Sequence, residues 1–290
     1  MPPAAGQGRL EEGAPSATAQ RVAVRRAAHQ LLDDPRVFED PLALTVIGRE
    51  AAAALRQGLD QQRTPWNQAL RAFMATRSRY AEDRLAEAYA SGVRQYVVLG
   101  AGLDTYALRN PHPDLAVFEV DHPSTQAWKR MRLEDAGMLA LAGLTFAPVD
   151  FQRQGLAEGL AAAGFDAGKP AFFSWLGVAM YLYEDAVFLT LGFVAGLPAP
   201  SEIVFDFMMR PELMSPVSRA AAEALSRGVA ALGEPFRSAF DPEDLVRRLQ
   251  GAGFSEAETL GADELNPLYF EGRRDGLKLT GSGRLARARV

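Results

Sequence analysis

The strongest constraint on this chain is a short apolar run that ends in two glycines at alternate positions, within residues 95–105. Tyr96 to Leu99 combine aromatic and β-branched side chains, a pattern typical of a short buried strand. Gly100 can adopt the positive φ of a tight turn, and Gly102 lets backbone N–H groups approach a ligand closely. In open α/β sheets, a turn after the first strand is where nucleotide-like ligands bind. The stretch therefore predicts an α/β sheet with a ligand site at its first turn.

The next apolar run, residues 115–121, ends in two acids, Glu119 and Asp121. Asp121 lies 19 positions after Gly102, close to the spacing of roughly 20 residues expected for an acid that hydrogen-bonds ribose hydroxyls. The alternative is structural: the glycines shape an ordinary turn, and Asp121 caps a helix that begins at Pro123. Both interpretations place Asp121 at the end of the second strand.

Two residues of the turn indicate which nucleoside cofactor it binds. A dinucleotide fingerprint has a third glycine where the helix packs under a pyrophosphate, and Thr105 occupies that position here. Asp104 places an acid at the mouth of the turn, where it repels a pyrophosphate but attracts the sulfonium and ammonium of S-adenosylmethionine. The turn therefore favours a methyl donor over NAD, and an NAD-dependent oxidoreductase is the alternative.

These motifs resemble the leucine carboxyl methyltransferase family: Leu-Gly-Ala-Gly-Leu-Asp-Thr at 99–105, followed by Phe-Glu-Val-Asp-His-Pro at 118–123. More closely, they resemble its bacterial branch of O-methyltransferases, linked to polyketide and other natural-product pathways. The resemblance implies a class I methyltransferase with S-adenosylmethionine as cofactor. Its Rossmann-like sheet is expected to have seven strands, mostly parallel with one antiparallel, under a helical lid. The likeness extends over most of the chain, through residues 38–43, 76–79, 174–178, 181–182, 234–238 and 253–254.

The resemblance also implies a set of cofactor contacts. The pair Asp150 and Phe151 is expected to recognise the adenine amino group and to cover the adenine ring. Leu176 stands where the eukaryotic protein-methylating members have Glu, which removes one polar contact and weakens the transfer of their protein substrate to this chain. The predicted cofactor-binding residues are Arg77, Gly100, Ala101, Gly102, Asp104, Glu119, Asp121, Asp150, Phe151 and Leu176.

Arg77 is singled out by its position on a predicted helix over 65–90. It follows Phe73 by four residues and precedes Tyr80 by three, so it lies on the apolar stripe of that helix. A charge on a core-facing stripe needs a partner, because burying it alone is costly. The resemblance supplies the methionine carboxylate of the cofactor as that partner. A structural acid, or the end of a neighbouring helix, is the alternative.

The order of elements predicts one domain. Residues 1–17 are rich in Pro, Gly and Ala and are expected to be a disordered tail, followed by a single methyltransferase domain over 18–290. Within it, 18–90 is expected to form a helical cap, and 209–240 a lid insertion with a helix at about 216–232. Alternation of strands and helices predicts a parallel sheet covered on both faces. Strands are expected at 95–99, 115–120, 144–149, 171–176, 203–208, 255–260 and 276–280.

Composition and missing motifs exclude several classes of function. A net charge of −5 argues against nucleic acid or an anionic membrane as the main partner, and no apolar run approaches the roughly 20 residues of a membrane helix. The absence of cysteine excludes disulfides and thiol chemistry, and three scattered histidines make a metal cluster an unfavoured interpretation. No signal peptide pattern is present, so a cytoplasmic protein is expected. Ser174 lacks the flanking glycines of a hydrolase nucleophile elbow.

The predicted reaction is in-line transfer of a methyl group from the sulfonium to an oxygen of a small-molecule substrate. No catalytic residue is assigned, because the sequence shows no convincing base. A carboxylate or an acidic phenol needs none, so these acceptors are favoured over an ordinary hydroxyl. A non-catalytic module that binds the cofactor is a further alternative. The residues predicted to contact substrate are Tyr106, Met180, Tyr181 and Arg237.

Overall fold

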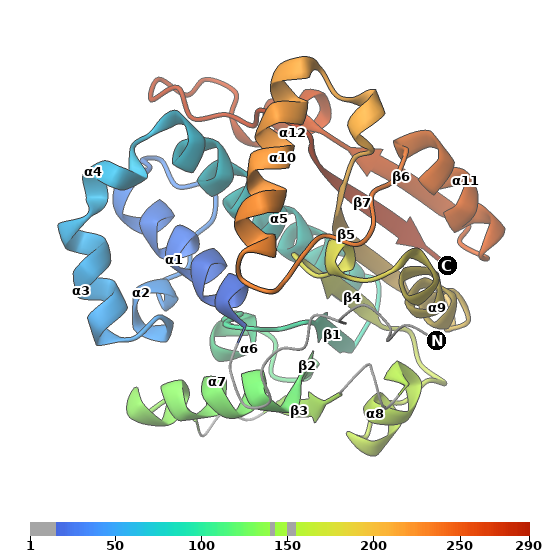
Figure 1. The fold of residues 1–290 in the computed structure, drawn as a ribbon. Coiled ribbons are helices and arrows are strands. Elements are labelled where there is room, and N and C mark those ends of the chain that lie inside the picture. Colours follow the sequence, from blue (N-terminus) through green and yellow to red (C-terminus); the bar gives the residue numbers. More distant parts are fainter. Residues whose placement is uncertain (1–15, 140–142, 150–154) are drawn as a thin grey trace, which may run out of the picture.

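The computed structural model describes residues 16–139, 143–149 and 155–290 and contains a seven-stranded sheet (Figure 1). In chain order the strands are β1 (Gln95–Leu99), β2 (Ala116–Asp121), β3 (Leu144–Pro148), β4 (Phe172–Trp175), β5 (Glu202–Met208), β6 (Glu256–Leu260) and β7 (Gly283–Arg289). Their order across the sheet is β3-β2-β1-β4-β5-β7-β6, and β7 alone runs antiparallel to the others. The predicted mostly parallel sheet with one antiparallel strand is confirmed.

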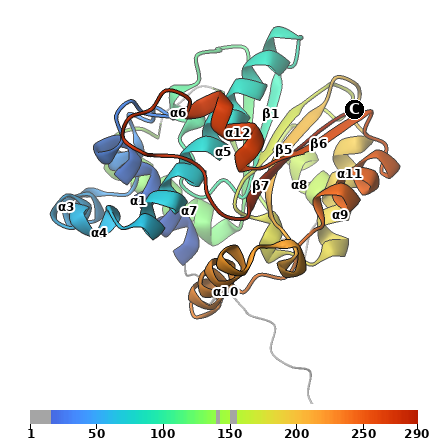
Figure 2. The ribbon, with the colours of Figure 1, turned by 90° about the horizontal axis from the view of Figure 1, so that it is seen from above.

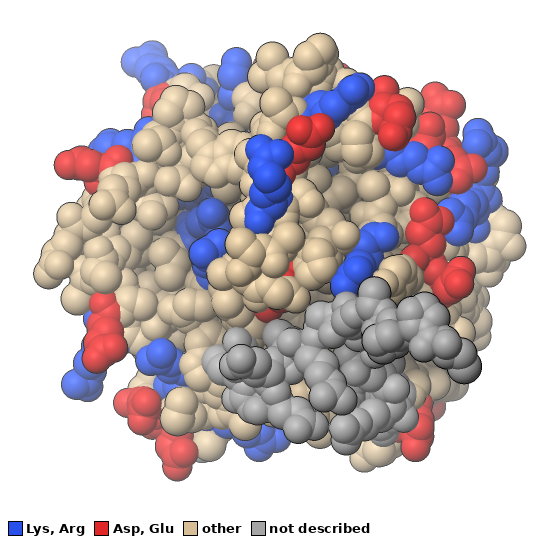
Figure 3. All heavy atoms as spheres, viewed as in Figure 1, with Lys and Arg blue, Asp and Glu red and all other residues tan. Residues whose placement is uncertain are grey.

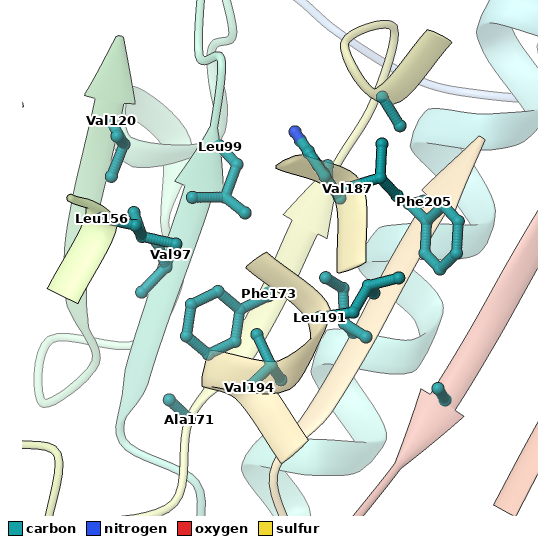
Figure 4. Packing of buried hydrophobic residues seen from close by; sticks show 14 of the residues in the cluster. Val97, Leu99, Val120, Leu156, Ala171, Phe173, Val187, Leu191, Val194 and Phe205 are labelled. Atoms are coloured by element: carbon teal, nitrogen blue, oxygen red, sulfur yellow. The ribbon is translucent and has the colours of Figure 1, made fainter. Parts of the chain in front are cut away.

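Helices cover both faces of this sheet. On one face lie α8 (Leu156–Ala162), α9 (Glu184–Ala195) and α11 (Pro242–Gly251), and on the other α5 (Pro65–Ala90), α6 (Tyr106–Arg109) and α12 (Ala262–Tyr269). Successive strand residues point to opposite faces, so Val97 and Leu99 join the first core (Figure 4), while Tyr96 and Val98 join the second. Burial on both faces accounts for the continuous apolar runs of the strands.

The N-terminal helices form a third apolar cluster beside the glycine turn. They are α1 (Ala17–Leu32), α2 (Ala43–Val46), α3 (Arg49–Gln57) and α4 (Leu59–Gln62). Leu103 of the glycine turn packs among them. The long helix α5 follows, and it begins at the predicted place because Thr64 is its N-cap and Pro65 its first residue. The turn after β1 is therefore held from the side of α1.

The segment expected as a lid contains the one-turn helix η2 (Pro211–Leu213) and α10 (Pro216–Ala230). Of the 15 residues of α10, only Val229 is buried. In Figure 2, α10 lies away from the helices that cover the sheet. A helix with so little buried surface contributes little to the core. No helix in the described part of the chain has the length and apolar character needed to cross a membrane.

The C-terminal prediction was partly wrong. Residues 276–280 form no strand, and the last strand, β7, lies at 283–289 between β5 and β6. Its three arginines, Arg284, Arg287 and Arg289, gave the segment a polar character that concealed a central strand. The structure pairs one of them, Arg287, with Glu202 of β5 and Glu258 of β6. Acids on both neighbouring strands thus neutralise a charge that the local sequence leaves unexplained.

Candidate functional site

A cavity of about 910 Å³ lies across the carboxyl ends of β1, β2, β4 and β5. Its volume is at the upper end of the range of about 300–1,000 Å³ typical of ligand pockets. The one-turn helix η1 (Ala179–Tyr181) and helices α1, α5 and α10 complete the wall. Figure 3 shows basic groups in the hollow between the N-terminal helices and α10. The predicted site residues that line it are Arg77, Gly100, Ala101, Gly102, Asp104, Asp121, Leu176, Met180, Tyr181 and Arg237.

The glycine turn needs glycine at both positions. Gly100 has a φ of 65°, and a Cβ there would overlap Cγ2 of Val178, which follows β4. Gly102 has a φ of 47°, and a Cβ there would lie 3.2 Å from the Cβ of Ala19 in α1. Side chains rarely adopt either backbone conformation. The turn is therefore shaped by contacts from the β4 loop and from α1.

Asp121 closes one side of the turn from the end of β2. Its Oδ2 accepts a hydrogen bond from the backbone N–H of Gly102 at 2.6 Å, and its Oδ1 accepts one from His122 at 2.7 Å. Burial raises the pKa of Asp121, while these two backbone hydrogen bonds oppose the rise. The N-cap of α7 (Pro123–Asp135) is His122, whose ring accepts from the backbone of Ser124. Asp121 is thus not the helix cap of the structural alternative, and lone pairs remain on its carboxylate for a ligand.

Thr105, which replaces the third glycine, ties the turn to the N-terminal helices. Its Oγ1 donates to Oδ2 of Asp40 at 2.8 Å and accepts from Nη2 of Arg26 at 2.9 Å. Arg26 and Asp40 also form a buried ion pair. Burial tends to raise the pKa of Asp40, but the Arg26 guanidinium outweighs it and holds that pKa below its usual range. Asp104 lines the cavity, and its Oδ1 accepts from the backbone of Tyr106 at 2.8 Å.

Arg77 lies at the cavity and also has a structural partner. Its Nη1 donates to Oδ2 of Asp206 at 2.6 Å, with side-chain exposures of 5% and 1%. The other oxygen of Asp206 accepts from the backbone of Gly177. A Cβ on Gly177 would lie 2.9 Å from Nη2 of Arg77, so glycine there lets the guanidinium lie against the backbone. The remaining N–H groups of Arg77 have no hydrogen-bond partner among the described residues, and they are available to a ligand in the cavity.

The predicted substrate residues of η1 and of the segment after α10 lie together. The carbonyl oxygen of Met180 accepts from the backbone N–H of Arg237 at 2.7 Å. The rings of Tyr181 and Phe236 pack with centroids 5.2 Å apart. Burial raises the pKa of Tyr181 to about 12, with Glu234 adding to the rise. The Tyr181 phenol is therefore protonated at neutral pH and does not act as a base there.

Four predicted residues are not part of the described cavity wall. Glu119 is buried and its Oε2 pairs with Lys129 at 2.5 Å, while its Oε1 has no hydrogen-bond partner among the described residues. Tyr106 is buried against the sheet, and its hydroxyl donates to Asn110 at 3.3 Å. Both residues have internal contacts, and their predicted cofactor and substrate contacts stay predictions. Asp150 and Phe151 lie outside the described residues.

The sequence did not single out Arg21, Arg25 or Asp206 as site residues, yet all three line the cavity. Arg21 and Arg25 are four residues apart on α1, which puts them on one face of the helix. Asp206 interrupts the apolar run of β5, and a lone acid in a buried strand implies an internal cation. The spacing of the two arginines on α1 and the single acid in the apolar run of β5 were the sequence signals that could have identified these residues.

Comparisons with known proteins agree on the fold and the family. A Thermobifida fusca structure described as a methyltransferase covers 97% of this chain and 96% of its own, with 18% identity and a TM-score of 0.56, which shows the fold. YktD of Bacillus subtilis, named as an S-adenosyl-L-methionine-dependent methyltransferase by inference, is 31% identical over 278 residues, which are 88% of this chain and 91% of YktD. A similarly named Mycobacterium tuberculosis protein, Rv3787c, is 36% identical over 189 residues, which are 63% of this chain and 60% of its own. The family model described as leucine carboxyl methyltransferase matches residues 19–195. The chain therefore belongs to the leucine carboxyl methyltransferase family.

Proposed function

We propose that this protein is an O-methyltransferase that transfers a methyl group from S-adenosylmethionine to a carboxylate or hydroxyl of a small molecule of natural-product or polyketide-like type. The predicted cofactor is confirmed at the level of the family. The observation that carries the proposal is a single cavity lined by the glycine turn, Asp121, Arg77 and Tyr181. A cofactor and an acceptor can then share one enclosed space.

The described residues fit the ribose and the amino-acid end of S-adenosylmethionine, whereas the predicted adenine contacts, Asp150 and Phe151, lie outside them. Asp121 retains lone pairs for the ribose hydroxyls. Arg77 retains donors for the carboxylate of the amino-acid end, and Asp104 supplies a negative charge for the ammonium. Gly100 and Gly102 remove the side chains that would fill the turn. The structural partner of Arg77, Asp206, does not remove it from the site, because a guanidinium has five N–H donors.

Methyl transfer requires the protein to align the cofactor with the acceptor more than it requires the protein to transfer a proton. When bound, the cofactor supplies a methyl group on a positively charged sulfur. Holding two reactants in a near-attack geometry can contribute about 7–11 kcal/mol. Among the described lining residues, Tyr181 is protonated, Asp206 is held by Arg77, and Ser174 shares a hydrogen bond with Tyr96 at 2.7 Å. None of these three is a free base, although His122, Asp104 and Glu234 also line the cavity. An acceptor that is already ionised at neutral pH, such as a carboxylate or an acidic phenol, would need no base.

Neither alternative to a methyltransferase is favoured. An NAD-dependent oxidoreductase is expected to have a glycine where Thr105 stands, and the Thr105 side chain is committed to Asp40 and Arg26. A non-catalytic binding module would bind the cofactor without turnover. Catalytic turnover, rather than affinity, separates that module from an enzyme.

The test uses S-adenosylmethionine with a tritiated methyl group and a panel of apolar carboxylic acids and phenols. Transfer to a carboxylate gives a methyl ester, which releases volatile methanol in alkali, whereas a methyl ether does not. We expect transfer, with alkali-labile label if the acceptor is a carboxylate. Cofactor binding without transfer to any acceptor would support the non-catalytic module, and tight NAD binding would contradict the proposal.

A further inference from the structure

Beyond the glycine turn, the cavity extends between two helices that present apolar faces to it. From α5, the lining residues are Pro65, Trp66, Ala69, Leu70, Phe73 and Met74. They recur at spacings of three and four, which places them on one face of the helix. Trp66 is 40% exposed although it is a large apolar side chain. This face of α5 is therefore only partly covered by protein.

The opposite wall comes from α10. Its lining residues include Val217, Ala221, Ala224, Leu225 and Val229, again spaced as one helical face. Val217 is 81% exposed, and Val229 alone is buried. In an ordinary surface helix, such a face is buried against the core. Here it faces the cavity, so the space between α5 and α10 is suited to an apolar ligand.

Between these walls and the glycine turn, α1 contributes two arginines without partners. Arg21 and Arg25 line the cavity, and neither forms an ion pair or hydrogen bond with a described residue. The Nε of Arg25 is buried and unsatisfied. Burial, with the guanidiniums of Arg21 and Arg77, lowers the pKa of Arg25. Asp206 neutralises Arg77, so the partly buried charge of Arg25 beside the exposed Arg21 is the one that an anion in the cavity would stabilise.

The most deeply buried arginines of the described part of the chain each have an acid, whereas Arg132, like Arg25, has an unsatisfied Nε and no ion pair with a described residue. Arg26 pairs with Asp40, Arg71 with Asp33, and Arg77 with Asp206. The fold thus supplies an acid to each arginine that it buries. Arg25 differs from Arg132 because it lines the cavity, where a ligand can supply the negative charge that no acid of the described residues provides.

We infer that this part of the cavity is the acceptor subsite and that it binds an amphipathic acid. The acid group pairs with Arg25 and Arg21, and the apolar body lies between α5 and α10. This inference rests on the proposed function and specifies its substrate class. The cofactor has one carboxylate, for which Arg77 is the predicted partner, so Arg25 and Arg21 remain for the acceptor.

The test compares naphthoate with its neutral analogue naphthamide, titrated into protein saturated with S-adenosylhomocysteine. We expect naphthoate to bind more tightly. Arg25→Gln should lower the affinity for naphthoate about tenfold and leave that for naphthamide unchanged. Ala221→Trp, which fills the space from α10, should weaken both probes. The control is Arg227→Gln, because Arg227 lies outside the cavity lining and its nearest acid is Glu223 at 4.0 Å.

Three results would overturn the inference. Equal affinity for the two probes would remove the acid subsite, and so would no binding of either at millimolar concentration. A loss of S-adenosylhomocysteine affinity in Arg25→Gln, with naphthoate unaffected, would assign Arg25 to the cofactor. If S-adenosylhomocysteine fails to bind while naphthoate remains selective, the proposed function is contradicted but the acid subsite is not.

Discussion

Arg77→Lys separates the predicted contact with the cofactor carboxylate from the structural ion pair of this arginine. Arg77 uses Nη1 for Asp206, and its other N–H groups are available at the cavity. Lys keeps a positive charge beside Asp206 but cannot donate two parallel hydrogen bonds to a carboxylate. We therefore expect the variant to fold and to bind the amino-acid end of the cofactor more weakly.

The magnitude follows from the contacts. A hydrogen bond to a charged group contributes about 1.5–3 kcal/mol, so losing one lowers affinity by roughly tenfold to a hundredfold. Removing the charge altogether would leave Asp206 buried alone and cost about 3–5 kcal/mol of folding free energy. Lys is chosen over an apolar residue for this reason.

The assay is calorimetric titration with two ligands. S-adenosylhomocysteine keeps the amino-acid end and should lose affinity, whereas methylthioadenosine lacks it and should bind as before. Arg71→Lys is the matched control, because Arg71 lies on the same helix, is equally buried and pairs with Asp33, but does not line the cavity. It should lower stability without changing either affinity. Equal losses for both ligands in Arg77→Lys would show that Arg77 supports the pocket as a whole, and no loss would remove it from the site.

Three further predictions concern the turn and its supports. Asp121→Ala should weaken cofactor binding by about 1–3 kcal/mol. Because burial raises the pKa of Asp121, the wild-type affinity for the cofactor should fall on acidification at a pH above 3.8. In calorimetric titrations, Asp121→Asn should flatten this dependence of affinity on pH. Asp40 contributes stability above the unfolded pKa of 3.8 that is lost as pH falls through its lowered folded pKa, so Asp40→Asn should lower Tm at neutral pH and reduce its acid dependence. Gly100→Ala should cost about 1–3 kcal/mol in urea unfolding, from its positive φ and the overlap with Val178.

Most of the fold could be predicted because its elements have local start signals. Helix α5 begins at Thr64-Pro65 and α11 at Asp241-Pro242, as expected from capping chemistry. The parallel topology then places the ends of β1 and β2 side by side, since Leu99 pairs with Val120. The meeting of the glycine turn with Asp121 therefore follows from sequence order alone.

The remainder depends on partners that are distant in sequence. Arg77 and Asp206 are separated by 129 positions, and the sequence around either residue does not identify the other as its ion-pair partner. Arg287 identifies a central strand only once Glu202 and Glu258 are in place on both sides. In each case a charge inside an apolar pattern signalled that a partner exists. The fold was needed to say which one.

The proposed acceptor subsite shows why substrate class is the hardest property to predict from a sequence such as this one. The apolar faces of α5 and α10 have the same helical spacing that a core helix has, so the pattern alone predicts burial. Only the structure shows that α10 buries Val229 and leaves Val217 81% exposed. An apolar face at the cavity that the protein does not cover, beside an Arg25 that has no ion pair with any described residue, is a feature of a ligand site rather than of a core. The class of acceptor is therefore inferred from the difference between the burial that the apolar pattern of these helices predicts and the burial that the structure shows.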